Sequence, residues 1–128
     1  MQITLPVKPK IIYSAWLDSQ EHSAMTGGST ATIDPRKGGK FSAWDGYITG
    51  VILKLEPFHR IEQSWRTTEF PHNAPDSHLE VRFNEMNDQT TVTLIHSNLP
   101  ESQVDDYQQG WEDYYFKPMQ KYFSGLDK

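Results

Sequence analysis

The spacing of the apolar residues changes twice along this sequence, and that change constrains the fold more than any other feature. Between residues 30 and 96, apolar and polar side chains alternate with a period of two, which is typical of half-buried β-strands. Beyond residue 101 the apolar residues recur three or four positions apart, which is typical of one face of a helix. A sheet built from sequential hairpins, with a long helix packed on one face, satisfies both patterns.

Turn signals divide the alternating region into strands. Asp45-Gly46 and Asn87-Asp88 favour tight hairpin turns, and Pro57 ends a strand because proline cannot donate to a sheet ladder. The expected strands span residues 30–33, 40–44, 47–55, 60–67, 79–86 and 90–96, and residues 2–6 form a further short strand.

Helical spacing also appears between the first strand and the alternating region. Pro9 suits the first turn of a helix, because its missing N–H is not needed there. Asp18 or Ser19 then caps a second short helix that runs through Met25 and stops at a pair of glycines. We therefore predict that residues 1–128 form a single α+β domain. Its curved antiparallel sheet of six to seven strands wraps around the long C-terminal helix.

The last segment predicts one amphipathic helix that starts at Glu101 or Ser102. Pro118 lies inside this segment and removes one backbone hydrogen bond, so we expect a kink near Tyr114. We expect Gly110 to lie where the helix approaches a strand closely, because a glycine leaves room for a neighbouring backbone.

Alternation assigns one face of each strand to the interior, because a register slip of one residue would bury several charges. In the strand at residues 47–55, Val51, Leu53 and Leu55 are predicted to point inward. Gln63 and His96 are polar side chains that also fall on inward faces. Each needs a hydrogen-bond partner, which is a backbone group, a water molecule or a ligand.

A strongly bent sheet around one helix leaves a hollow, and such hollows are typical ligand sites. We predict the lining of this cavity from the inward positions of the strands and helices. The predicted lining consists of Met25, Trp44, Leu53, Gln63, Trp65, Leu79, Val81, Phe83, Leu94, His96, Tyr107, Trp111 and Tyr115. The aromatic members also have the spacing of ordinary core residues.

Composition limits the partners and the environment of the chain. The 17 acidic and 12 basic residues give a formal charge of −5, which disfavours binding to nucleic acid or to an anionic membrane surface. The absence of cysteine excludes disulfides, thiol catalysis and thiolate metal sites. No stretch is apolar enough to predict a membrane span or a signal peptide, so we expect a soluble cytoplasmic protein.

Motifs of enzymes and cofactor-binding proteins are absent from the sequence. There is no Gly-x-Ser-x-Gly nucleophile elbow, no glycine-rich phosphate loop and no His-Glu-x-x-His pair. His72, Asp76 and His78 lie near one another, but their spacing matches no rigid metal-binding template. We therefore expect no metal, no cofactor and no catalytic residue. If the cavity is catalytic, His96 is the natural acid or base.

Four runs of residues carry a resemblance to a known family. They are Gly38-Gly39 with Phe-Ser-Ala-Trp-Asp-Gly-Tyr-Ile-Thr-Gly at 41–50, Leu55-Glu56-Pro57 with Arg60 to Arg66, His96-x-Asn98-x-Pro100, and the aromatic series from Tyr107 to Phe123. Together they resemble the domain homologous to the C-terminal half of the activator of the heat-shock protein 90 ATPase. The resemblance covers about residues 3 to 123, and the shared order of the runs makes it specific.

This resemblance implies the helix-grip fold of the START-like (SRPBCC) superfamily, with a hydrophobic cavity between the sheet and the last helix. Our main functional expectation is a non-catalytic domain that binds a small apolar or lipid-like ligand in that cavity. The first alternative is a co-chaperone that binds and modulates a heat-shock protein 90 class ATPase. The second alternative is a cyclase-like or hydrolase-like enzyme, because related helix-grip proteins include such enzymes.

Overall fold

A computed structural model describes residues 1–126 of the protein. The strands are β1 (Gln2–Leu5), β2 (Thr32–Ile33), β3 (Lys40–Ala43), β4 (Ile48–Glu56), β5 (Arg60–Thr67), β6 (Ser77–Met86) and β7 (Gln89–Ser97). The helices are α1 (Pro9–Leu17), α2 (Ser19–Met25), α3 (Val104–Gly110) and α4 (Lys117–Leu126), with a 3-10 turn at Glu101–Gln103 and a π-helical turn at Trp111–Phe116. The predicted order of strands and helices is confirmed.

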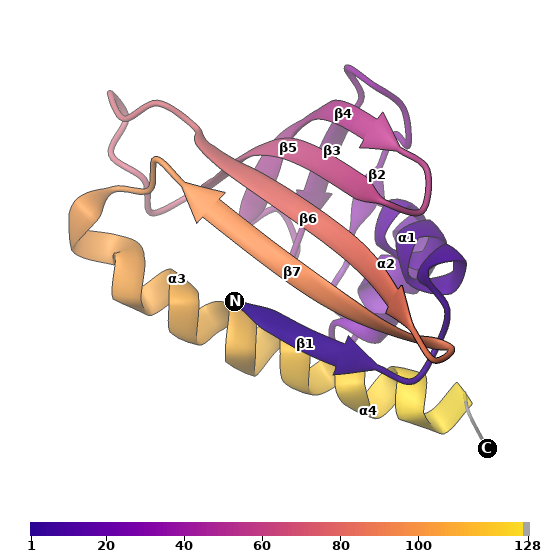
Figure 1. The fold of residues 1–128 in the computed structure, drawn as a ribbon. Helices are drawn as coiled ribbons and strands as arrows, with labels where there is room; N and C mark the ends of the chain where they lie inside the picture. Colours follow the sequence, from indigo (N-terminus) through magenta and orange to yellow (C-terminus); the bar gives the residue numbers. More distant parts are fainter. Residues whose placement is uncertain (127–128) are drawn as a thin grey trace.

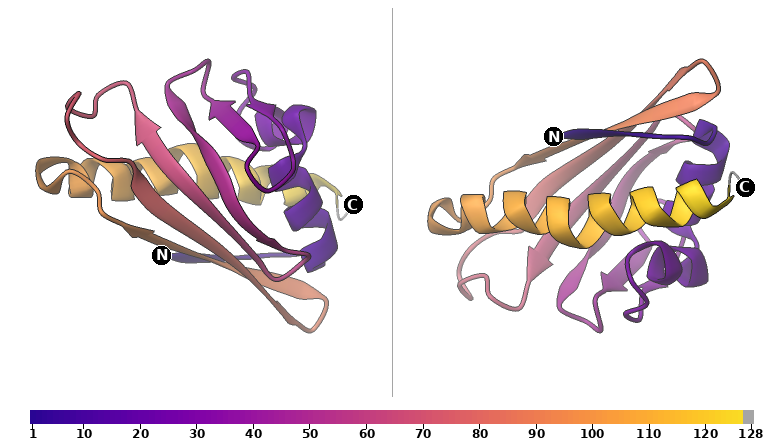
Figure 2. Two further views of the ribbon diagram at one scale, coloured as in Figure 1. Left: turned by 90° about the horizontal axis from the view of Figure 1, so that it is seen from above. Right: turned by 90° about the horizontal axis from the view of Figure 1, so that it is seen from below.

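The strands form one antiparallel sheet in the order β1-β7-β6-β5-β4-β3-β2. Strands β2 to β7 are neighbours in chain order, as hairpin connections require, whereas β1 pairs with β7 from Gln2↔Thr93 to Leu5↔Thr90. Figure 1 shows the curved sheet lying over the long C-terminal helix. Figure 2 shows that helix crossing one face of the sheet obliquely, with α1 and α2 beside its C-terminal end. The predicted sheet wrapped around a helix is therefore confirmed.

The N-terminal helices begin where the sequence predicts. Pro9 occupies the first turn of α1, and the Asp18 carboxylate accepts a hydrogen bond from the Glu21 backbone N–H at 2.9 Å. Asp18 is thus the cap of α2 rather than Ser19. The Ser19 hydroxyl instead accepts from the Ile33 backbone N–H at 2.9 Å, which ties α2 to β2.

A β-bulge in β4 changes which of its residues face the core. The pairing of β4 with β5 shifts by one between Ile52 and Lys54, so Leu53 is the extra residue. The predicted inward positions of Val51 and Leu53 are wrong for this reason. Ile52 is fully buried, Val51 is half-buried, and Leu53 is 42% exposed. Beyond the bulge the observed inward face of β4 agrees with the predicted one again, and Leu55 packs against the core.

A π-helical turn takes the place of the predicted kink in the C-terminal helix. The backbone N–H of Lys117 donates to the carbonyl of Glu112, five residues earlier. In a regular α-helix the ring of Pro118 would collide with the carbonyl of Tyr114. The wider turn ends at Phe116, two residues before that proline, and accommodates it, so the helix continues into α4. The irregularity lies where the sequence predicts it, but its form differs.

The core fills the space between the concave face of the sheet and the helices. It includes most of the inward positions predicted from alternation. The apolar side chains with essentially no exposed surface are Leu5, Ile12, Met25, Ile52, Ile61, Leu79, Val81, Val92, Met119 and Phe123. No helix within residues 1–126 has both the length and the apolar character that crossing a membrane requires.

The contact made by Gly50 gives a stability prediction. A Cβ atom at Gly50 would lie 2.0 Å from the Ser64 carbonyl oxygen and 2.7 Å from the Phe41 ring. Gly50→Ala is therefore expected to lower the free energy of unfolding by about 1–3 kcal/mol or more, measured by urea denaturation.

Gly110→Ala is the matched control, because a Cβ atom there meets only Tyr114 Cδ2 at 3.9 Å. Gly110 has helical dihedral angles, so this change is expected to raise the free energy of unfolding by up to about 1 kcal/mol. Equal stability of the Gly50→Ala variant and the unsubstituted protein would contradict the close approach at β4.

Candidate functional site

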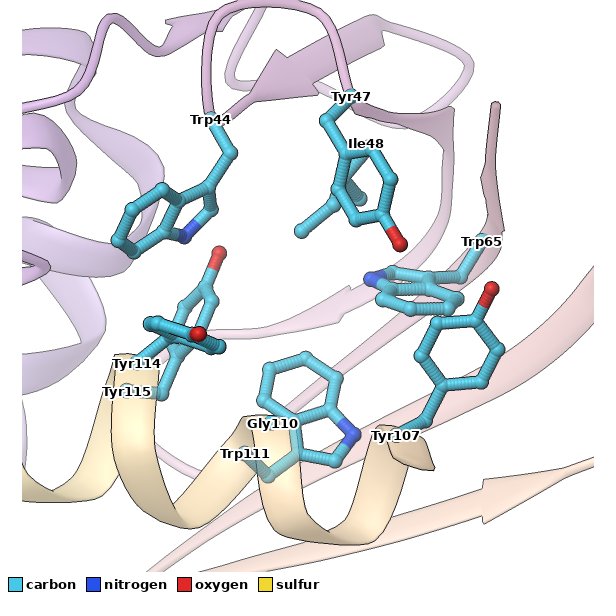
Figure 3. A pocket seen from close by; sticks show the side chains of 9 residues that line it. All are labelled: Trp44, Tyr47, Ile48, Trp65, Tyr107, Gly110, Trp111, Tyr114 and Tyr115. Atoms are coloured by element: carbon cyan, nitrogen blue, oxygen red, sulfur yellow. The ribbon is translucent and has the colours of Figure 1, made fainter. Parts of the chain in front are cut away.

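An aromatic pocket of about 420 Å³ lies where the turn between β3 and β4, strand β5 and the C-terminal helix meet (Figure 3). All but two of its lining residues carry an aromatic ring, and none carries a charge. The lining consists of Trp44, Tyr47, Ile48, Trp65, Tyr107, Gly110, Trp111, Tyr114 and Tyr115. A concave apolar site of this size is typical of sites for small molecules.

The structure divides the predicted cavity residues into three groups. Those that line this pocket are Trp44, Trp65, Tyr107, Trp111 and Tyr115. Those that are buried in the core without lining it are Met25, Gln63, Leu79, Val81, Phe83 and Leu94. Leu53 points outward because of the bulge, and His96 packs against the rings of Trp65 and Trp111 from outside the pocket. Ligand contact by any of these residues stays a prediction.

Sequence reasoning missed Tyr47, Ile48 and Tyr114. Ile48 lies before the bulge, so the face assigned from Leu53 and Leu55 placed it on the wrong side of the strand. The spacing of Ile48 and Ile52, four apart, was the available signal for that face. Tyr114 follows Trp111 by three positions, a spacing that puts both side chains on one side of a helix.

Gly110 was predicted to lie against a strand, and this prediction is wrong. A Cβ atom at Gly110 would contact only its helix neighbour Tyr114, at 3.9 Å. The residue lines the pocket instead. The absence of a side chain therefore leaves space for the pocket rather than for a neighbouring backbone.

The π-helical turn supplies three walls of the pocket, namely Trp111, Tyr114 and Tyr115. Figure 3 shows these side chains rising from one stretch of the helix towards Trp44 and Ile48. Turns of this kind are rare and occur frequently at functional sites. The coincidence of the π-helical turn with the pocket favours a functional role for this end of the helix.

Hydrogen bonds tie the helix to the sheet through His96. Trp111 Nε1–H donates to His96 Nδ1 at 3.1 Å, so the proton of the neutral ring lies on Nε2. His96 Nε2–H then donates to Ser77 Oγ at 2.8 Å, and the Ser77 hydroxyl donates to the Trp65 carbonyl at 2.7 Å. Both ring nitrogens are occupied. Burial, and secondarily the nearby His78, lowers the pKa of His96 to about 4.

A second set of hydrogen bonds joins α1, α2 and the helix. His22 Nδ1–H donates to the Trp16 carbonyl at 2.8 Å, which leaves Nε2 to accept from the Tyr115 hydroxyl at 2.8 Å. Trp16 Nε1–H donates to Gln63 Oε1 at 2.9 Å, so the buried glutamine has a protein partner. Burial lowers the pKa of His22 to about 4 and raises the pKa of the Tyr115 hydroxyl above its usual value.

The hydroxyls of Tyr107 and Tyr47, which also line the pocket, have partners too. Tyr107 donates to Gln103 Oε1 at 2.7 Å and accepts from Thr67 Oγ1 at 2.6 Å. Tyr47 donates to the Glu69 carboxylate, and burial together with this contact raises the pKa of Tyr47 above its usual value. These phenols therefore present ring surfaces rather than free hydroxyls to the pocket.

Trp44 differs from the tryptophans in these networks. Its Nε1 atom is buried and has no hydrogen-bond partner among the described residues. Its backbone is left-handed, with a φ of 54°, and the next two residues, Asp45 and Gly46, have φ values of 57° and 88°. A buried donor without an acceptor is unfavourable, and so is a left-handed backbone at a bulky residue.

Charged side chains gather on the opposite, convex face of the sheet. Arg60 lies 2.6 Å from Glu56, 3.6 Å from Glu62 and 3.8 Å from Glu80. His78, one of the residues considered for a metal site, lies 3.0 Å from Glu62. Within residues 1–126 no group of three or more His, Cys, Asp or Glu residues is arranged to hold a metal ion. The lining of the pocket is therefore uncharged, whereas Arg60 and its acidic neighbours pair on the outer side.

The two neutral histidines predict how stability depends on pH. The folded pKa values of about 4 lie below the 6.5 of an unfolded histidine, so the unfolded chain binds protons first as the pH falls. The free energy of unfolding is expected to decrease between pH 6.5 and 4, by up to about 1.4 kcal/mol per pH unit for each histidine. Urea denaturation at pH 7, 6 and 5 measures this slope.

Substitution of one histidine separates the contributions of His22 and His96 to this pH dependence. His96→Gln should reduce the pH slope by about half, because one of the two groups that take up a proton on unfolding is removed. His59→Gln, at an exposed position, serves as the control for the replacement of a histidine by glutamine. An undiminished slope in the His96→Gln variant would show that His96 is not held neutral in the folded protein.

Comparison with known proteins places the chain in a family. The family model described as "Activator of Hsp90 ATPase homolog 1-like protein" matches residues 6–124. The human protein "Activator of 90 kDa heat shock protein ATPase homolog 1" is 26% identical over 120 residues, which are 94% of this chain and 35% of the human protein. The chain spans about a third of the length of the curated relatives it matches.

Solved structures share the fold. An HSP90 activator from Plasmodium falciparum has a TM-score of 0.86 and 23% identity, over 97% of this chain and 95% of that one. The protein CalU16 from Micromonospora echinospora has a TM-score of 0.74 and 27% identity, over 98% of this chain and 71% of that one. The chain has the helix-grip fold of these neighbours and belongs to the family of activator of Hsp90 ATPase homolog 1-like proteins.

Proposed function

We propose that this protein is a non-catalytic binding domain whose aromatic pocket holds a small apolar ligand. The observation that carries the proposal is the pocket itself, an uncharged hollow of about 420 Å³ walled by seven aromatic rings. Pockets for small molecules have volumes of about 300–1,000 Å³ and mostly apolar walls. A hollow of this kind also leaves its lining atoms without van der Waals partners, which a ligand would supply.

The chemistry of the lining supports binding rather than catalysis. Tyrosines are the titratable residues that line the pocket, and the hydroxyls of Tyr47, Tyr107 and Tyr115 are engaged in hydrogen bonds. His96, the acid or base of the enzyme alternative, does not line the pocket and has both ring nitrogens occupied. General acid–base catalysis needs a group within hydrogen-bond reach of the reacting atom. We therefore favour a binding role.

A substitution that fills the pocket tests this proposal. N-phenyl-1-naphthylamine, an uncharged probe that fluoresces in apolar surroundings, is expected to bind the protein saturably. Gly110→Leu places a side chain in the open space beside Tyr114 and should weaken binding by at least about tenfold, which corresponds to about 1.4 kcal/mol. Fluorescence titration measures the affinity.

Gly125→Leu provides the matched control. It adds the same side chain to α4 at a position where no atom lies within 4 Å of the added Cβ and which does not line the pocket. Its affinity for the probe should equal that of the unsubstituted protein, and thermal denaturation checks that both variants fold. Absence of saturable binding, or equal affinities in all three proteins, would reject the pocket as a ligand site.

A second candidate function is action on a chaperone of the heat-shock protein 90 class. The observation that favours it is the name of the curated relatives, which describes them as activators of that ATPase. The chain corresponds to about a third of those relatives, so the activity of the whole protein is here a proposal for one part of it. Such a domain would bind the chaperone directly and change its rate of ATP hydrolysis.

An ATPase assay tests whether the protein has this activity. Addition of the purified protein to a heat-shock protein 90 class chaperone is expected to raise the rate of ATP hydrolysis above the basal rate. The Gly110→Leu variant should raise the rate equally if the pocket and the chaperone contact are separate. No binding in a pull-down, together with an unchanged rate, would exclude this candidate.

A further inference from the structure

We propose that the ligand of the aromatic pocket is an uncharged planar molecule whose oxygen accepts a hydrogen bond from the indole N–H of Trp44. This inference rests on the proposed ligand-binding function and specifies the chemistry of the ligand. It assigns Trp44 the role of the polar anchor in an otherwise apolar site. Pockets for small molecules commonly combine apolar walls with a few placed polar groups that fix orientation.

The unpartnered indole N–H is the first observation. Trp16 Nε1 donates to Gln63 at 2.9 Å and Trp111 Nε1 donates to His96 at 3.1 Å, so these two buried indoles are satisfied within the fold. Trp44 Nε1 is buried and has no partner among the described residues. Figure 3 shows this nitrogen on the edge of the ring that faces the pocket. Buried polar groups without partners are uncommon in native structures.

The backbone that carries Trp44 is the second observation. Three consecutive residues, Trp44 to Gly46, adopt left-handed φ values. Hydrogen bonds on both sides of Asp45 hold this turn: its N–H donates to the Thr30 carbonyl at 3.0 Å, and its carboxylate accepts from the Thr30 N–H at 2.8 Å. Strained backbone that is fixed in this way clusters at ligand-binding sites. The turn thus holds the indole over the pocket at the expense of local strain.

Tyr114 gives the ligand a route to the indole N–H. Its ring packs edge-on against Trp44, with ring centroids 5.3 Å apart and an interplanar angle of 68°. The Tyr114 side chain is nevertheless 57% exposed, so few contacts oppose its rotation. Rotation of Tyr114 away from Trp44 would open space beside the indole ring, which the ligand oxygen would then occupy.

The lining also determines the charge and shape of the ligand. No Lys, Arg, His, Asp or Glu residue lines the pocket, so a buried carboxylate or ammonium group would have no counter-charge. A ketone or ether oxygen needs only the single donor that Trp44 offers. Trp65 and Trp111 lie with their ring centroids 5.6 Å apart, and such aromatic walls favour flat rings in offset or edge-on packing.

Three naphthalenes of nearly equal size test the inference. 2-Acetylnaphthalene carries a ketone oxygen, 2-ethylnaphthalene lacks it, and 2-naphthoate is charged. In isothermal titration calorimetry the ketone should bind the protein roughly five- to tenfold more tightly than the hydrocarbon, as one neutral hydrogen bond allows. The carboxylate should bind most weakly. Trp44→Phe should remove the preference for the ketone, so that this variant binds the ketone and the hydrocarbon with equal affinity.

A measurement on the unsubstituted protein keeps the test valid even if the variant misfolds. In ¹H–¹⁵N spectra the indole N–H signal of Trp44, assigned by its absence in Trp44→Phe, should shift downfield with the ketone but not with the hydrocarbon. The indole signal of Trp16, which is bonded to Gln63, is the internal reference and should not move. A ketone that leaves the Trp44 signal in place would overturn the proposed anchor.

The outcomes separate this inference from the function on which it rests. Equal affinities for the ketone and the hydrocarbon would reject the hydrogen bond to Trp44 and retain the pocket as a ligand site. Binding of the carboxylate as tight as that of the ketone would reject an uncharged ligand. Failure of all three naphthalenes to bind would reject the ligand-binding function and this inference together.

Discussion

The C-terminal helix packs on the sheet through a mostly apolar interface, in which the hydrogen bonds of a few buried polar groups restrict how the helix can lie. Burial of an indole N–H or an imidazole without a partner is strongly unfavourable. A chain of hydrogen bonds runs from Trp111 to His96 and on to Ser77, and its last bond reaches a backbone carbonyl of β5. A different rotation of the helix would break this series, so the hydrogen bonds select one orientation from the many that apolar contact alone would permit.

That orientation brings two local irregularities together at the pocket. The left-handed turn at Trp44 shapes its sheet side, and the π-helical turn shapes its helix side. Farther along the helix, in the regular α4, Met119 and Phe123 are completely buried. The two irregular turns contribute Trp44, Trp111, Tyr114 and Tyr115 to the pocket, beside residues of β5 and α3 that have regular geometry. π-Helical turns occur frequently at functional sites.

The pocket and the charged convex face lie on opposite sides of the sheet and suit different partners, a small ligand and a protein. Arg60 and its acidic neighbours lie on the far side of the sheet from the aromatic lining. A small ligand in the pocket and a protein partner on the outer surface need not compete for the same atoms. Membership of the activator family bears on the protein partner, because the names of the relatives refer to a chaperone. The geometry of the pocket bears on the small ligand.

The sequence by itself determined the order of the elements, the hairpins and the burial of positions such as Val81 and Phe83, because these depend on local turn chemistry and on periodicity. It also indicated the aromatic residues of the pocket, such as Trp65 and Trp111. It did not reveal the bulge that turns Leu53 outward, the hydrogen bonds that occupy both ring nitrogens of His96, or the unpartnered N–H of Trp44. These features depend on which atoms meet across distant strands and helices, and only the tertiary structure decides that.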